Sequence, residues 1–541
     1  MEDHEIEIYK RTKDSLLTIL DLNMSPDHYL TMCRQENYLV WKVLILDEHA
    51  NTVLAPLVHI SDLRQHNIPV FLPLHSKREA LHSVTIIYLI QPTPENIHQI
   101  IQDCKNSLYD IFQINFLSPP SETDLNILAQ GLIEAKSLNK LHKIYEQYLN
   151  YIILEPQLFT LNGPTFEVLN RSGVSDNQIE LTMEDIAKSL FCVLKNCKVW
   201  PIIKSGKGFS EIIAHKLSEL CWENAEEVSS INRPLLMIVD RNIDLSIMLH
   251  HSWSYQALLY DIFSNTMNKV IIPTTPPQVY EMNKAKDKFW SDFSMSGFDQ
   301  VLQNIDKQFN DWKAEYDKLG DNLVQAFENV EELTEKKASL DLHMMMATEM
   351  VKRVKERHLD MYNEFEEGLM KGNNVEIDGL LNNGEASEEV LKDRLRLMAI
   401  SYLAKEKDFT LKPEFFDYLR TLKPKTITES TMMSLAGLMG KVKDKVMGNE
   451  KMLPLTRLLH SAMENKEKEM DYFDSKFRNG QKYKREFSEA IVFVVGGGSY
   501  AEYHNLLQYA ESYQKNVIYA STSMVAPNEF LQELLNLSTS G

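Results

Sequence analysis

Residues 298–319 read FDQVLQNIDKQFNDWKAEYDKL, and this stretch places an apolar or aromatic residue at alternating steps of four and three. Its members are Phe298, Leu302, Ile305, Phe309, Trp312, Tyr316 and Leu319. The same spacing returns after Gly320, in Leu340, Met344, Ala347, Val351, Val354, His358, Met361 and Phe365. A mean period of about 3.5 residues is typical of a coiled-coil seam, and two such helices joined by a short turn pair antiparallel. Residues 289–365 therefore predict a long helical hairpin, which is either a buttress packed on its own core or an arm that holds partner helices.

Strand and helix signals alternate on both sides of this helical block. Before it, short apolar runs predict strands at 41–47, 70–74, 84–90, 113–117, 199–203 and 234–239. After it, residues 490–495 and 516–520 predict two further strands. Strands separated by helices indicate parallel sheets with both faces covered. We therefore predict an α/β plus α fold, in which the end of the chain completes a sheet that begins before the helical block.

The predicted domains follow these changes of pattern. Residues 1–150 form an N-terminal α/β domain, which a helical stretch over 125–149 closes. Residues 151–255 and 482–541 form a central α/β domain. Residues 256–481 form a mainly helical inserted domain that contains the hairpin.

The bulk composition excludes some classes of protein. The 541 residues carry a formal net charge of −20, which argues against a general nucleic-acid binder because phosphate repels such a surface. No apolar run approaches the roughly 20 residues that span a bilayer, so any membrane role is peripheral. The five cysteines are few and unclustered, which fits a reducing cytosol. We expect Cys192 and Cys197 to be buried structural thiols rather than metal ligands.

Two glycine-rich turns are the first candidates for chemistry. The segment GGGSY at 496–500 and the segment KSGKG at 204–208 each join a predicted strand to a predicted helix. Such turns can present backbone N–H groups to a phosphate. Neither segment has the glycine spacing of a dinucleotide fingerprint or the Gly-Lys-Ser/Thr end of a P-loop. A tight strand-to-helix turn is the favoured interpretation of both.

The segment DRNID, which begins at Asp240, follows the most apolar strand, where ligands often bind in open α/β sheets. Asp240 and Asp244 are candidates for holding Mg²⁺ with a phosphate, and His250 and His251 are candidate acids or bases. The alternative is a buried network of charges and hydrogen bonds, in which Arg241 satisfies a carboxylate with two hydrogen bonds.

Four segments resemble the SM (Sec/Munc) family of SNARE-binding proteins, and in particular its Sly branch of ER–Golgi traffic. The segment around the central strand reads RPLLMIVDRNIDLSIMLHHSWSYQALLYDIF over 233–263, with Asn242 and paired histidines as in that branch. The others are NYLVWKVLILDEH at 37–49, EKKASLDLHMMMATEMVKRVKERHLDMYNEFEE at 335–367 and EAIVFVVGGGSYAEYHNLLQYAE at 489–511. They occur in the family's order and span essentially the whole chain.

The resemblance implies an arch of three domains, with no enzymatic activity, no cofactor and no metal site. It implies a monomer that is cytoplasmic and peripheral on ER and Golgi membranes, and that promotes SNARE complex assembly and vesicle fusion in ER–Golgi transport. Its partners would be a syntaxin-type (Qa) SNARE and the cognate SNARE bundle, not nucleic acid. The alternatives are an SM subunit of an endolysosomal tethering complex and, against the motif evidence, a nucleotide-binding enzyme.

The resemblance also implies two partner-binding surfaces. In the family, an apolar groove on the first domain holds a short N-terminal peptide of the Qa-SNARE, and its residues fall here on Leu125, Leu128, Ala129 and Leu141. The alternative is that these side chains pack inward. The family's hairpin is a template that aligns SNARE helices, and the candidates on it here are Leu333, Leu340, Met344, Thr348 and Val351. Members of the Sly branch carry a long regulatory loop before the second hairpin helix, whereas the corresponding stretch here, 318–332, is short.

Overall fold

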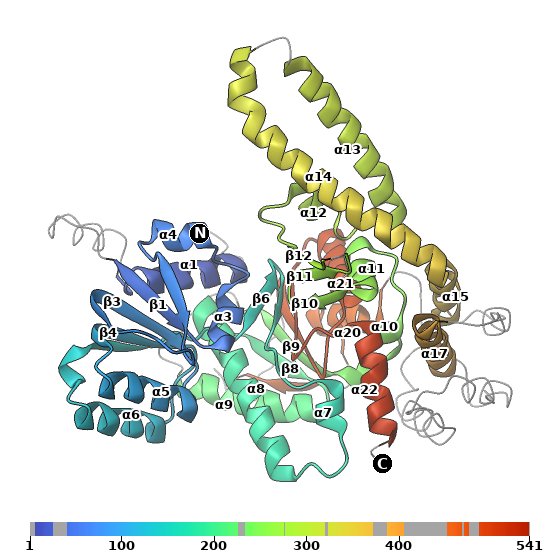
Figure 1. Cartoon of the computed structure of the whole chain (residues 1–541). Coiled ribbons are helices and arrows are strands. Elements are labelled where there is room, and N and C mark those ends of the chain that lie inside the picture. Colours follow the sequence, from blue (N-terminus) through green and yellow to red (C-terminus); the bar gives the residue numbers. More distant parts are fainter. Residues whose placement is uncertain are drawn as a thin grey trace.

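The computed structural model describes residues 6–24, 41–224, 233–274, 276–319, 323–371, 387–404, 452–467, 470–474 and 486–539. Figure 1 shows two α/β bodies side by side, with a long helical hairpin that projects from the second body. The first body carries the N-terminus, and the second contains strands from both the middle and the end of the chain.

The first body is built on a five-stranded parallel sheet in the order β2-β1-β3-β4-β5. Its strands are β1 (Lys42–Leu46), β2 (Val70–Pro73), β3 (Leu81–Ile90), β4 (Tyr109–Phe116) and β5 (Leu141–Glu146). Its helices are α1 (Ile8–Leu20), α3 (Glu48–Leu54), α4 (Ile60–Gln65), α5 (Pro94–Lys105), α6 (Glu122–Glu134) and the short 3-10 helix η1 (Leu138–Lys140). The strand β1 and the second halves of β3 and β4 are buried on both faces, as a parallel sheet covered by helices requires.

The strand β5 corrects the prediction of a helix over 125–149. Helix α6 ends at Glu134, and Lys136 takes a left-handed backbone conformation with a φ of 52°, which a continuing α-helix does not contain. The chain then returns as an edge strand, in which Ile144 pairs with Ile114 of β4. The side chains of β5 are half-buried or exposed, so their weak pattern does not by itself distinguish a strand from a helix.

The second body contains a seven-stranded sheet in the order β13-β8-β9-β14-β15-β7-β6. Its strands are β6 (Ile152–Glu155), β7 (Leu158–Thr160), β8 (Ile202–Ser205), β9 (Leu235–Asp240), β13 (Asp471–Phe473), β14 (Glu489–Val495) and β15 (Asn516–Ser521). The strand β14, from the end of the chain, lies parallel between β9 and β15. The edge strand β13 pairs antiparallel with β8, so one strand of this sheet falls inside the range 256–481 of the predicted inserted domain.

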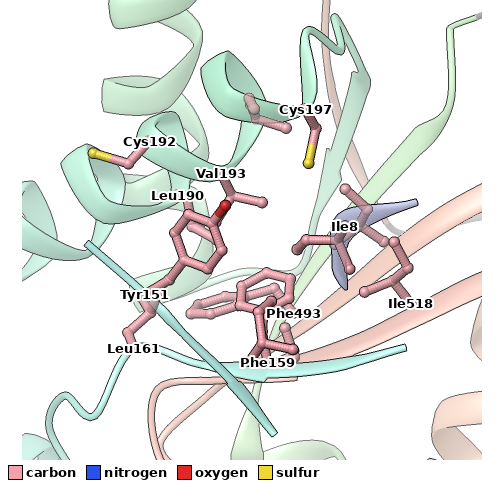
Figure 2. Packing of buried hydrophobic residues seen from close by; sticks show 14 of the residues in the cluster. Ile8, Tyr151, Phe159, Leu161, Leu190, Cys192, Val193, Cys197, Phe493 and Ile518 are labelled. Carbon is pink, nitrogen blue, oxygen red and sulfur yellow. The ribbon is translucent and has the colours of Figure 1, made fainter. Parts of the chain in front are cut away.

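One continuous apolar core joins the two bodies (Figure 2). Ile8 of α1 packs there with Phe159 of β7 and Phe493 of β14. The helix above them is α8 (Asp176–Cys197), which contributes Cys192 and Cys197. Both cysteines are buried, and burial raises the pKa of each thiol to about 12. The prediction of buried structural thiols is confirmed.

The remaining elements surround the second sheet and carry the hairpin. A small antiparallel sheet, which the sequence patterns do not predict, consists of β10 (Ser264–Thr266), β11 (Lys269–Ile272) and β12 (Gln278–Glu281). The helices are α7 (Phe166–Asn170), α9 (Phe209–Glu223), η2 (Arg241–Ile243), α10 (Ser246–Leu249), α11 (Tyr255–Ile262), α12 (Lys288–Phe293), α13 (Phe298–Leu319), α14 (Leu323–Arg357), α15 (Leu359–Met370), α17 (Glu388–Ala404), α20 (Pro454–Met463), α21 (Tyr500–Tyr513) and α22 (Pro527–Thr539).

The helices α13 and α14 form the hairpin that projects in Figure 1. Helix α14 already begins at Leu323, so most of the stretch 318–332 that we expected to be a short loop is helical. Residues 320–322, which join the two helices, lie outside the described residues. The described part of the chain contains no helix that is both long and apolar enough to cross a membrane.

The seam of α14 is displaced from the predicted one. Six of its buried side chains follow the same alternation of four and three, but they are Leu340, His343, Ala347, Met350, Val354 and Arg357. Leu333 and Met346 of the same helix are buried as well. The predicted members Met344 and Met361 are instead 36% and 41% exposed. His343 is accommodated at a buried position because its ring nitrogens lie 2.9 Å from the hydroxyl of Tyr255 and 3.0 Å from the carboxylate of Asp287.

The second hairpin helix is also interrupted where we predicted a continuous one. Helix α14 ends at Arg357, since His358 has a φ of 57°, and α15 begins at Leu359. The predicted continuation of the seam to Phe365 therefore spans two helices that meet at His358.

Candidate partner-binding sites

The helix α6 lies on the first sheet and exposes one flank. Ser121 caps it by accepting a hydrogen bond from the backbone N–H of Asp124. Leu128 and Leu132 face the core that α6 shares with α5 and the sheet. Gly131 allows the close approach of these two helices, because a Cβ atom there would lie only 2.5 Å from Cγ1 of Ile101.

The predicted groove residues divide between this core and the surface. Leu128 is 1% exposed, so it does not belong to an open apolar face with Leu125 and Ala129, and for this residue the inward-packing alternative holds. Leu125 is half-buried and Ala129 is exposed. Leu141 lies on the edge strand β5, where it is half-buried. Three of the four residues therefore present surface to solvent.

Sequence reasoning missed two residues of the same surface. Ile133 continues the line of Leu125 and Ala129 at steps of four residues, and it is 62% exposed. Leu138 of η1, which packs beside α6, is 54% exposed. The spacing of four residues between Ala129 and Ile133 could have predicted from the sequence that Ile133 belongs to this surface. Together with Leu125, Ala129 and Leu141, these side chains form what we call the α6 stripe.

The hairpin candidates divide in the same way. Leu333 and Leu340 are buried, with 9% and 1% exposure, because they lie on the side of α14 that packs on α13 and the body. In this structure the side chains of Leu333 and Leu340 are therefore not open to a partner. Thr348 is exposed, Met344 is 36% exposed and Val351 is half-buried. Their spacing of four and three residues places them on one face of α14, which we call the α14 face.

Cross-contacts hold the outer half of the hairpin together. The indole N–H of Trp312 on α13 donates a hydrogen bond to the carbonyl of Leu333 on α14 at 2.9 Å. Lys336 forms an ion pair with Glu315 at 2.8 Å. The ring of Tyr316 stacks on Trp312 with centroids 5.3 Å apart. The first two contacts attach α14 to α13, whereas the stack of Tyr316 on Trp312 lies within α13, and none of the three involves Met344, Thr348 or Val351.

In the glycine turn at 496–498, backbone N–H groups that could bind a phosphate are hydrogen-bonded within the protein. The N–H of Gly496 donates to the Thr522 hydroxyl at 3.0 Å, and that of Gly498 donates to the carbonyl of Ser523 at 2.8 Å. The turn at 204–208 is similar, because the backbone N–H of Gly206 donates to the carbonyl of Ile238 at 2.9 Å. Both segments are structural turns.

The charged side chains of the DRNID segment likewise hydrogen-bond to other groups of the protein. The carboxylate of Asp240 accepts hydrogen bonds from the backbone N–H groups of Phe209 and Ser210, and so fixes the start of α9. Arg241 makes two hydrogen bonds to Glu502, at 2.7 and 2.6 Å, as the network interpretation predicts. Asp244 accepts a hydrogen bond from the backbone N–H of Ser246 at the start of α10. Among the described residues, no group of three or more His, Cys, Asp or Glu side chains has a geometry that could hold a metal ion.

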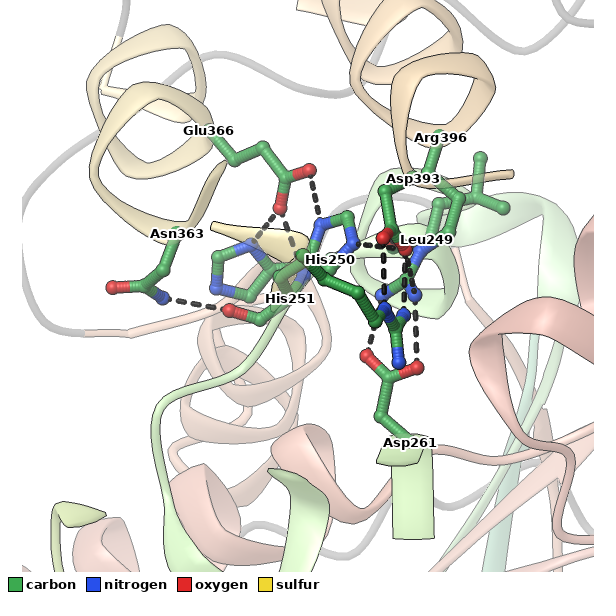
Figure 3. A network of polar contacts seen from close by, with 9 residues as sticks. Leu249, His250, His251, Asp261, Asn363, Glu366, Asp393 and Arg396 are labelled. Atoms are coloured by element: carbon green, nitrogen blue, oxygen red, sulfur yellow. Dashed lines mark hydrogen bonds and ion pairs between the residues drawn. The ribbon is translucent and has the colours of Figure 1, made fainter. Parts of the chain in front are cut away.

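The paired histidines also belong to a buried network (Figure 3). The ring of His251 lies between the carboxylates of Glu366 on α15 and Asp393 on α17, at 2.6 and 3.1 Å. His250 contacts the same Glu366 through Nδ1 at 2.9 Å. Every carboxylate here is occupied by a protein partner, which favours a structural role for both histidines over acid–base catalysis.

Comparison with known proteins identifies the family. The model of the Sec1 family matches residues 42–533, which include the first sheet, the hairpin and the end of the second sheet. The chain belongs to the Sec1 family. The resemblance that the four sequence segments predict is confirmed.

Relatives of known name cover this Sec1 family chain almost completely. The human Sec1 family domain-containing protein 1 is 30% identical over 598 residues, which cover 92% of this chain and 93% of the human protein. Protein SLY1 of Saccharomyces cerevisiae is 29% identical over 613 residues, with 93% and 91% coverage.

Solved structures agree with the fold. A crystal structure of Sly1p in complex with an N-terminal peptide of Sed5p is 27% identical and superposes with a TM-score of 0.83, covering 99% of this chain and all of that one. The structure of the SM protein Vps45 superposes with a TM-score of 0.80 at 17% identity, over 100% of this chain and 98% of that one, and it supports the fold alone. The predicted fold class, an arch of α/β and helical parts, is confirmed.

Proposed function

We propose that this protein binds a syntaxin-type (Qa) SNARE and promotes SNARE complex assembly in transport between the ER and the Golgi, as a peripheral protein of those membranes. The observation that carries the proposal is full-length similarity to Sly1p, whose structure holds an N-terminal peptide of Sed5p. The action is binding rather than bond chemistry, because the motifs that could serve catalysis are engaged in structural contacts.

The α6 stripe is the proposed site for the N-terminal peptide of the SNARE. Contiguous apolar patches that remain exposed on a folded domain mark interaction sites, and here Ile133 and Leu138 are more than half exposed beside Leu125 and Ala129. A peptide that places an aromatic or aliphatic side chain on this stripe would bury it. The side chain of Leu128 packs beneath α6 and supports the site by holding this helix on the sheet.

The α14 face is the proposed site for a SNARE helix. An amphipathic helix binds a surface whose apolar positions recur at steps of three and four residues, and Met344, Thr348 and Val351 supply that pattern. A methionine adapts its shape to different partners. Holding the SNARE at both sites raises the local concentration of its helical segment, and a preformed helical surface lowers the entropic cost of alignment.

A pull-down from detergent-solubilised membranes, analysed by mass spectrometry, tests the proposal. The wild-type protein is compared with Ala129→Arg, which places a charge on the α6 stripe, and with Gln65→Arg on α4. Gln65 is also exposed, and its helix α4 lies well away from α6 on the first body (Figure 1), so this control adds the same charge elsewhere.

We expect wild type and Gln65→Arg to recover an ER–Golgi Qa-SNARE, and Ala129→Arg to lose it. Recovery by all three proteins would remove the α6 stripe from the proposal. Recovery of a large tethering assembly in place of free SNAREs would support the alternative of a tethering-complex subunit.

A further inference from the structure

The ring of His251 is the centre of a buried ionic network at the base of the hairpin (Figure 3). Its Nδ1 atom lies 2.6 Å from Glu366 Oε1 and its Nε2 atom lies 3.1 Å from Asp393 Oδ1. Both ring nitrogens therefore face a carboxylate oxygen, and a histidine donates from both nitrogens only as an imidazolium. The ring of Tyr362 stacks on it at a centroid distance of 5.1 Å.

Two arginines extend this network to the end of the hairpin and to the second body. Arg357, the last residue of α14, makes two hydrogen bonds to Asp393, at 2.9 and 2.6 Å. Arg396 makes two hydrogen bonds to Asp261 of α11, at 2.8 Å each, and donates to the carbonyl of Leu249 at 2.7 Å. All of these charged side chains are buried.

Within the ion pairs that link these groups, the charges balance when His251 carries a proton, and the further buried cation of this region, Arg394, is hydrogen-bonded to Tyr362. The arginines Arg357 and Arg396 supply two positive charges, whereas Glu366, Asp393 and Asp261 supply three negative ones. The imidazolium of His251 completes the balance. Burying an uncompensated charge is costly, so loss of this one proton destabilises the whole arrangement.

The network lies at the junction of α14 and α15, where the hairpin joins the rest of the molecule. Helix α14 ends at Arg357, the left-handed residue His358 follows, and α15 leaves in a new direction. Glu366 ties α15 to the 250–251 loop through His250, through the His251 ring and through the His251 backbone N–H at 2.8 Å. Asn363 donates a further hydrogen bond to the carbonyl of His251 at 2.8 Å.

We propose that His251 is a positioning residue, whose charged ring clamps α15 and α17 onto the central α/β body and so sets the direction in which the hairpin projects. The importance of that direction for partner alignment rests on the proposed function, since a SNARE held at the α6 stripe must also reach the α14 face. The clamp itself is a property of the folded chain and can be measured without any SNARE.

The test measures the distance between two nitroxide labels by pulsed electron spin resonance on the full-length chain. One label is attached at Lys313→Cys on α13 and the other at Gln508→Cys on α21, both exposed positions. Cys33 is replaced by serine, and Cys104, Cys192, Cys197 and Cys221 are buried away from the reagent. The variants compared are His251→Gln, which leaves the network one charge negative, and His251→Gln with Glu366→Gln, which restores the balance.

We expect one narrow distance distribution for the wild type, a broadened or shifted one for His251→Gln, and a return towards the wild-type distribution in the double variant. A merely structural loss of packing would not be rescued by a second substitution at Glu366. An unchanged distribution in His251→Gln, or a double variant as broad as the single one, would overturn the proposal.

A pH series on the wild-type protein gives an independent result if His251→Gln does not fold. The groups that face His251 are Glu366 and Tyr362 from α15, Asp393 and Arg396 from α17, and the neighbouring His250. Behind them, Arg357 from α14 holds Asp393 and Arg394 from α17 holds Tyr362. The carboxylates favour the protonated ring, so the distribution should stay narrow around neutral pH and broaden as rising pH removes the proton. A distribution that does not change until the whole protein unfolds would contradict the clamp.

Binding of a Qa-SNARE N-terminal peptide separates this inference from the proposed function. We expect the peptide affinity to be the same in wild type and His251→Gln, because the α6 stripe lies in the first body. Absence of peptide binding in the wild type would remove the proposed function and leave the distance result standing.

Discussion

The α6 stripe and the hairpin are attached to the molecule by different forces. Helix α6 is held by apolar contacts, with Leu128 and Leu132 pressed onto the sheet and α5. The hairpin is held at two places. His343, within α14, hydrogen-bonds to Tyr255 and Asp287, and the ionic network around His251 lies where α14 meets α15. Apolar packing is insensitive to pH, whereas a buried ionic network depends on the protonation of each member. One protein thus carries two proposed partner surfaces whose stability should respond differently to substitution and to pH.

The largest expected effect is at the ionic base of the hairpin. Asp393→Ala removes the carboxylate that holds both Arg357 and His251, and it leaves two buried cations without that partner. Removing one partner of a buried pair costs about 3–5 kcal/mol. Hydrogen exchange should accelerate in α15 and at the end of α14 and stay unchanged in α6. Equal acceleration in both regions would contradict the separation of the two anchors.

The matching substitution in the apolar anchor is Leu128→Ala. Truncating a fully buried leucine costs about 2–5 kcal/mol, and here we expect a loss of about 3 kcal/mol. Hydrogen exchange should become faster in α6 and stay unchanged at the hairpin. Leu125→Ala, at a half-buried position of the same helix, is the control and should cost about 1 kcal/mol or less. Equal losses for the two leucines would show that Leu128 is not the anchoring residue.

Acid should weaken the hairpin base before it weakens α6. Burial opposes ionisation of Glu366, but the charge of His251 and the hydrogen bonds from both histidines outweigh it and lower the pKa of Glu366 to about 2. A lowered carboxyl pKa contributes stability above the ordinary value of about 4.5, and this stability is lost as the pH falls towards 2. The difference corresponds to about 3 kcal/mol. Exchange measured between pH 5 and pH 3 should rise in α15 first, and Glu366→Gln should remove most of that pH dependence.

A smaller effect is expected where α6 meets α5. A Cβ atom added at Gly131 would lie 2.4 Å from Cδ1 of Ile101, so Gly131→Ala should overpack this contact and cost about 1–3 kcal/mol. Gly163→Ala is the control, because its added Cβ would have its nearest neighbour at 3.6 Å. Thermal unfolding of the two variants checks this, and equal melting temperatures would mean that Ile101 moves aside without cost.

The sequence patterns predict the fold well where burial is continuous. The strands β1, β9 and β14 are apolar at almost every position because helices cover both faces of their sheets, and this signal is unambiguous. The edge strand β5 has no such signal, since its side chains are half-buried or exposed, and a helix was predicted in its place. The late completion of the second sheet is visible in the sequence because the helical block between the strands has a different period.

The partner sites are harder to predict because one helix can have two apolar faces. On α14, Met344 and Met350 both look like seam residues, and only the pairing of His343 with Asp287 and Tyr255 decides which one faces inward. On α6, periodicity places Leu125 and Leu128 on a common apolar flank, but the core buries Leu128 fully and Leu125 only in part. Contacts with residues far away in the sequence settle these cases, and no local pattern contains them.

The central claim is that an N-terminal Qa-SNARE peptide binds the exposed part of α6 and not the hairpin. Calorimetric titration of such a peptide tests it with the wild type, Leu125→Lys and Met344→Lys, each checked for unchanged thermal unfolding. Both substitutions place the same charge at an incompletely buried apolar position, one on each surface. We predict that affinity falls by at least about tenfold for Leu125→Lys, or about 1.4 kcal/mol, and is unchanged for Met344→Lys. Unchanged affinity for Leu125→Lys in a folded protein would contradict it.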